Sequence, residues 1–132
     1  MSNLKIKDLS IGDWIKAGGE PARVIQLGIA GRNKAKGLSG RIYGFLTSVE
    51  IQPIPITPEI LKSNGWYEED YDTCTDYITD NTLIMYNKEE LKDWKVLIMN
   101  GSPVVRVKVF FFYVHELQHA LRLAGIDKDI TL

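Results

Sequence analysis

The segment 110–125, FFFYVHELQHALRLAG, decides how the chain ends, because an apolar run passes straight into a helical pattern. Apolar side chains recur every three or four residues at Val114, Leu117, Leu121 and Ala124. This spacing predicts a helix with one apolar stripe that packs on a sheet, and Gly125 is expected to end it. The same segment holds both histidines of the chain, so any metal chemistry would be centred here.

His115, Glu116 and His119 spell H-E-x-x-H, which on a helix places two histidines one turn apart. In zinc peptidases of this pattern the histidines hold the metal and the glutamate is the general base. A catalytic zinc also needs a third protein ligand, and Gly125 stands where one large class has its third histidine. We therefore interpret the segment as a packing helix with His115 and His119 on a more polar flank. A zinc-dependent, peptidase-like hydrolase is the alternative.

Upstream of this segment, 95–99 (KVLIM) and 103–110 (PVVRVKVF) have the composition of strands. In the second run Val105, Val107 and Val109 share one face, and Arg106 and Lys108 share the other. The intervening Asn100-Gly101-Ser102 is typical of a tight turn. The two runs are therefore predicted to pair as an antiparallel hairpin.

The middle of the chain, 53–66 (PIPITPEILKSNGW), predicts a short helix from Pro58 to Ser63. Thr57 has the character of an N-cap, and proline is favoured at the first helical position. Asn64-Gly65 supplies a left-handed stop. The acidic and aromatic stretch after it, 67–80, is expected to be a solvated edge or loop.

The N-terminal region begins with IGDWI at 11–15, followed by the turn signal GGEP at 18–21 and an apolar run at 22–29. Two such runs around a Gly/Pro turn predict a hairpin, and the arrangement is similar to small SH3-like barrels. The glycine-rich stretch 31–40 is expected to be a loop. Basic residues lie in this stretch and directly after it. They form a weak candidate binding site for a protein or nucleic acid, made of Arg32, Lys34, Lys36 and Arg41.

Composition narrows the class of protein. A chain of 132 residues with net charge −1 is about one domain, without a general attraction to nucleic acid or acidic lipid. The chain has one cysteine, which cannot form an internal disulfide, and it shows neither an apolar leader nor a long apolar run. These features favour a cytoplasmic protein that is not embedded in a membrane. We expect a single α+β domain, divisible into an SH3-like subdomain of residues 1–52 and an α+β subdomain of residues 53–132. Its strands are expected to be mostly antiparallel, with a short central helix and a C-terminal helix packed on a β-hairpin.

Three motifs together, IGDWI, PIPITPEILKSNGW and YVHELQHALRLAGI, resemble a family of short uncharacterised proteins. The family is found in gut anaerobic bacteria, their prophages and mobile elements. Its members often have a sequence similar to VHQLQN in place of 114–119, which departs from this chain at Glu116 and His119. The resemblance implies no activity. The function that we expect is that of a phage- or mobile-element-associated binding or accessory module, without a cofactor.

Overall fold

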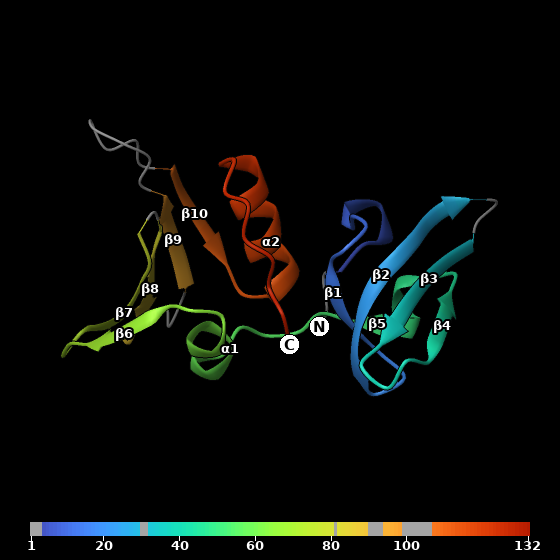
Figure 1. Cartoon of the computed structure of the whole chain (residues 1–132), viewed down its shortest axis with the longest axis horizontal. Coiled ribbons are helices and arrows are strands. Elements are labelled where there is room, and N and C mark those ends of the chain that lie inside the picture. Colours follow the sequence, from blue (N-terminus) through green and yellow to red (C-terminus); the bar gives the residue numbers. More distant parts are fainter. Residues whose placement is uncertain (1–3, 30–31, 81, 90–93, 99–106) are drawn as a thin grey trace. The chain divides into compact units, whose positions relative to one another are not determined.

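The computed structural model of the chain describes residues 4–29, 32–80, 82–89, 94–98 and 107–132. The chain divides into two compact units (Figure 1). The N-terminal unit comprises Met1–Pro55 with Tyr113–His115, and the C-terminal unit comprises Ile56–Phe112 with Glu116–Leu132. A single domain with subdomains of residues 1–52 and 53–132 stays a prediction.

The N-terminal unit is built on a five-stranded antiparallel sheet in the order β4-β3-β2-β1-β5. Its strands are β1 (Trp14–Ala17), β2 (Glu20–Ile29), β3 (Arg32–Gly37), β4 (Ile42–Phe45) and β5 (Ile51–Gln52). Two 3-10 turns complete it, η1 (Ile6–Asp8) and η2 (Ser48–Glu50). The last strand returns to pair with the first, which curls the meander into the small SH3-like half-barrel that the sequence predicts.

The first hairpin forms where the Gly/Pro turn signal predicts it. Ala17 pairs with Glu20, and the two residues between them, Gly18 and Gly19, have φ of 59° and 81°. This left-handed backbone is accessible to glycine at little cost. Alternate residues of the hairpin face inward and form much of the core of the unit: Ile15, Ala17, Ala22 and Val24.

The expected loop at 31–40 is wrong, because most of it is strand β3. Residues alternate along β3 between exposed and buried, with the basic side chains outward and Asn33, Ala35 and Gly37 inward. Small inward residues suit the tight interior of a curled sheet, so glycine and alanine here mark close packing rather than a loop. Only the short segment 38–40 is a turn, which the Gly37 N–H closes by donating to the Arg41 carbonyl at 2.8 Å.

The C-terminal unit has a second five-stranded antiparallel sheet, in the order β10-β9-β8-β7-β6. Its strands are β6 (Tyr67–Asp70), β7 (Cys74–Ile78), β8 (Thr82–Asn87), β9 (Trp94–Ile98) and β10 (Val107–Phe111). The predicted hairpin of β9 and β10 is confirmed, with Val109 opposite Val96. Its predicted turn at Asn100-Gly101-Ser102 lies outside the described residues.

The acidic stretch 67–80 is ordered as a hairpin of β6 and β7 rather than a loop. β6 is the edge strand of the sheet, as the edge interpretation predicts. The stretch also contributes to the core, because Tyr77 is only 2% exposed and its ring contacts Trp94. Trp94 in turn contacts Phe111, so aromatic side chains from three strands meet in this unit.

Two helices complete the fold. α1 (Pro58–Ser63) has the predicted N-cap, with the Thr57 hydroxyl accepting the Ile60 N–H at 3.3 Å. α2 (Val114–Leu123) is the predicted C-terminal helix, packed through the buried side chains of Leu117 and Leu121, and Gly125 comes after it with φ of 74°. Among the described residues, neither helix is long and apolar enough to cross a membrane.

Candidate functional site

The outer face of β3 carries three cationic side chains in a row, Arg32, Lys34 and Lys36, which we call the basic stripe. Side chains two residues apart on a strand lie on one face, about 6.6–6.8 Å apart along the chain. All three residues are exposed, and none forms an ion pair with a residue that the structure describes. The stripe is therefore a local positive surface on a chain whose net charge is only −1.

Aliphatic residues of the neighbouring strand lie beside the stripe. Ile42 pairs with Lys36 and is 49% exposed, and Leu46, which follows β4 on the same face, is 69% exposed. Between them, Gly44 pairs with Lys34 and presents no side chain. The outer face of this corner is thus both cationic and aliphatic.

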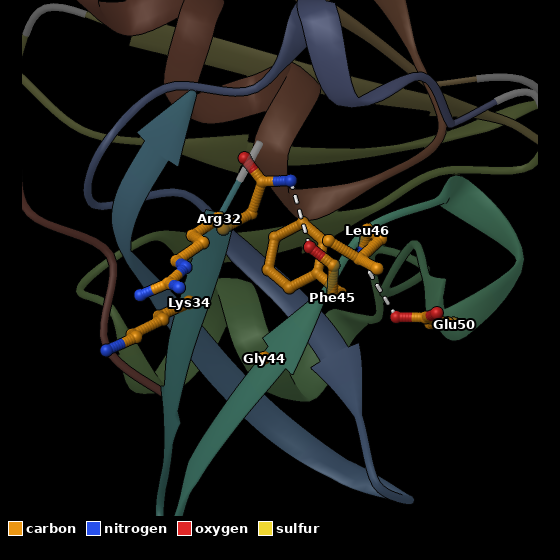
Figure 2. A pocket seen from close by; sticks show the side chains of 7 residues that line it. Arg32, Lys34, Gly44, Phe45, Leu46 and Glu50 are labelled. Carbon is orange, nitrogen blue, oxygen red and sulfur yellow. Dashed lines mark hydrogen bonds between the residues drawn. The ribbon is translucent and has the colours of Figure 1, made fainter. Parts of the chain in front are cut away.

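A shallow hollow of about 420 Å³ lies at the same corner (Figure 2). It is lined by Arg32, Asn33, Lys34, Gly44, Phe45, Leu46 and Glu50. Two hydrogen bonds of the buried Asn33 side chain hold its base: the amide nitrogen donates to the Phe45 carbonyl at 2.9 Å, and the amide oxygen accepts the Gly28 N–H at 2.9 Å. The Glu50 carboxylate accepts the Leu46 N–H at 3.0 Å. The hollow therefore has a fixed base and exposed cationic side chains at its rim.

The structure does not bring Arg41 into the basic stripe. Arg41 pairs with Gly37, so it belongs to the face opposite the stripe, where its charge acts on Glu20. The Glu20 carboxylate accepts the N–H and the hydroxyl of Ser39, at 2.8 and 2.6 Å, and the hydroxyl of Tyr43. The hydrogen bonds from Ser39 and Tyr43 lower the Glu20 pKa to about 2, and the bond to Glu20 raises the Tyr43 pKa. This cluster fastens the 38–40 turn to β2 and is structural.

The H-E-x-x-H residues lie on α2 as expected, but the helix surroundings differ from the prediction. His115 is only 6% exposed, and its ring stacks on Tyr113 with centroids 6.0 Å apart, so it is not on a polar flank. Glu116 accepts the Phe112 N–H at 3.0 Å, the capping role of a first-turn carboxylate. Among the described residues, no three histidine, cysteine, aspartate or glutamate side chains form a metal-binding group. The zinc hydrolase stays an untested alternative.

The residues of the hollow that sequence reasoning missed are Gly44 and its neighbours on β4. Their signal is the period-two pattern Arg-Asn-Lys-Ala-Lys-Gly at 32–37, which indicates a strand and hence a partner strand beside the cations. No protein-family model, curated protein or solved structure matches this chain. We therefore base a function on the geometry of the basic stripe.

Proposed function

We propose that this protein is an accessory binding module whose N-terminal unit holds an acidic partner against the basic stripe. The observation that carries the proposal is the exposed row of Arg32, Lys34 and Lys36, unpaired with any described residue. Three like charges in a row repel one another weakly in water, and the opposite charge of a partner would turn that repulsion into attraction. The resemblance carried by the three sequence motifs supports an association with phage or mobile elements, and the single cysteine supports work in the cytoplasm.

The side chains beside the stripe favour a protein partner over a nucleic acid. Sequence-tolerant binding of single strands combines cations with exposed aromatic rings on which bases stack. On and next to the two strands that flank β3, the exposed apolar side chains of the described residues include Ile25, Ile42 and Leu46, which are aliphatic. Phe45 lines the hollow but is only 3% exposed. Aliphatic and cationic groups together suit a peptide that alternates carboxylate and apolar side chains.

A charge-reversal pair tests the proposal. Fluorescence anisotropy at low salt would compare the wild type, Lys34→Glu/Lys36→Glu and the control Lys5→Glu/Lys7→Glu, which changes the net charge equally on a different exposed segment. The probe is a labelled peptide of alternating glutamate and valine. We expect the stripe variant to lose binding and the control to keep it, with wild-type binding weakening as salt rises. Equal binding by both variants, or no binding by the wild type, would contradict the proposal.

Two further probes separate the partner classes. A labelled oligothymidylate of similar charge should bind more weakly than the acidic peptide, because no described exposed aromatic side chain beside the stripe offers its bases a stacking surface. Tighter binding of the oligonucleotide, abolished by Lys34→Glu/Lys36→Glu, would instead assign the stripe to nucleic acid.

A further inference from the structure

The strand next to the basic stripe, β4, is at one end of the strand order of its sheet (Figure 1). On one side it pairs with β3, and among the described residues no strand pairs with its other side. Edge strands present backbone N–H and C=O groups that can form hydrogen bonds with an added strand. A role for this edge rests on the proposed function, because it concerns how the same corner would hold an acidic partner.

The register shows which backbone groups of β4 face outward. In an antiparallel pair, opposite residues alternate between hydrogen-bonded and non-hydrogen-bonded positions. The Gly37 N–H donates to the Arg41 carbonyl at 2.8 Å, which identifies a hydrogen-bonded pair. The next such pairs are Ala35 with Tyr43 and Asn33 with Phe45. The N–H and C=O groups of Ile42 and Gly44 therefore point away from β3, toward the open edge.

The third outward N–H along this edge, that of Leu46, is already occupied. The Glu50 carboxylate accepts it at 3.0 Å, and 3-10 turn η2 brings the chain round to do so (Figure 2). This contact ends the edge after Gly44. The open ladder thus consists of two residues, Ile42 and Gly44, with four outward backbone groups.

The side-chain gap at Gly44 connects this edge to the basic stripe. Lys34 lies on β3, opposite Gly44, so β4 separates it from the open edge. A strand added to the edge would lie about 4.8 Å beyond β4, and its residue opposite Gly44 would project on the outer face. Since Gly44 has no side chain, a carboxylate on that residue and the Lys34 ammonium can meet above the strand, within the hollow. Any larger residue at 44 would separate them.

We propose that the partner is an extended acidic peptide segment that adds to β4 as an antiparallel sixth strand. Its backbone hydrogen-bonds to the outward N–H and C=O groups of Ile42 and Gly44, and the carboxylate opposite Gly44 projects over that glycine toward Lys34. The basic stripe supplies the charge complementarity that selects such a segment, and the alternation of side chains on a strand sets its pattern. An antiparallel arrangement continues the pairing of the whole sheet.

Two modified peptides test strand addition separately from charge. In this antiparallel register, the glutamate residues of a Glu-Val repeat have their N–H groups toward β4, and the valine residues have theirs toward solvent. N-methylation of the glutamates should weaken binding about tenfold or more, because two backbone hydrogen bonds are lost. N-methylation of the valines, with identical charge and composition, should leave the affinity near that of the parent peptide.

A variant tests the gap itself. Gly44→Val should fold, because a Cβ at this position meets only the Asn33 carbonyl oxygen, at 3.9 Å, and Gly44 is outside the set of positive-φ glycines. It leaves every cation in place but fills the space between Lys34 and the added strand, so we expect weaker binding of the parent peptide. The backbone readout is amide hydrogen exchange, which should slow at Ile42 and Gly44 when the wild type binds the peptide.

The outcomes separate the two proposals. If the peptide binds but both N-methylated forms bind equally and exchange at Ile42 and Gly44 is unchanged, strand addition is overturned while the acidic partner stands. If no acidic peptide binds, both fail. Protection of Ile42 and Gly44 that rises with protein concentration alone would assign the edge to a second copy of the chain and overturn the peptide. If oligothymidylate binds and the Ile42 and Gly44 amides are not protected from exchange, the peptide proposal is overturned and the partner is a nucleic acid.

Discussion

The ring of Tyr43 lies directly over Gly18, so that a Cβ at Gly18 would overlap the ring. Gly18 also has φ of 59°, but Gly19 beside it has φ of 81° and open space where a Cβ would stand. We therefore expect Gly18→Ala to destabilise the protein by about 1–3 kcal/mol more than Gly19→Ala, because overpacking adds to the same backbone strain. Urea unfolding of the two variants measures the difference. Equal losses would mean that the ring is displaced without cost.

Because of Glu20, the free energy of unfolding is expected to depend on pH in the acidic range. Its folded-state pKa of about 2 lies below the ordinary 4.5, mainly because Ser39 and Tyr43 donate hydrogen bonds to the carboxylate. A depressed pKa contributes stability that is present above pH 4.5 and is lost as the pH falls toward 2. Glu20→Gln should therefore show a smaller drop in unfolding free energy than the wild type across this window. Asp72→Asn, which removes an exposed carboxylate, is the control in the same urea titrations.

The local chemistry of the sequence predicts much of this fold and less of the site. The Thr57-Pro58 start of α1 and the Gly18–Gly19 hairpin depend on neighbouring residues alone, so their signals are readable in the chain. At β3 the sequence predicts the wrong structure, because glycine and alanine residues are typical of a loop. Their actual role, packing inward in a curled sheet, becomes clear only from the tertiary structure. Gly44 could not be singled out, since its importance depends on its register opposite Lys34. Burial of His115 likewise depends on tertiary packing.

The H-E-x-x-H alternative gives a direct prediction about metal. We expect protein purified without a metal column to contain far less than one zinc per chain, and its melting temperature to be unchanged by EDTA. The reason is that the described residues provide no third donor for His115 and His119. Elemental analysis and thermal melts are the measurements. One equivalent of zinc that disappears in His119→Ala would contradict this expectation and support a metal site, which the hydrolase alternative requires.

In the C-terminal unit, the buried Trp66 donates its indole N–H to the Thr82 hydroxyl at 2.9 Å. Trp66 is 2% exposed and Thr82 is fully buried, so water cannot replace a lost partner. We expect Thr82→Val to cost about 1–3 kcal/mol, because the indole N–H stays buried without its acceptor. The Thr82 hydroxyl also bonds Thr79, and a double-mutant cycle with Trp66→Phe separates the two contributions. If Thr82→Val costs as much in the Trp66→Phe background, the loss belongs to the Thr79 contact and not to the indole.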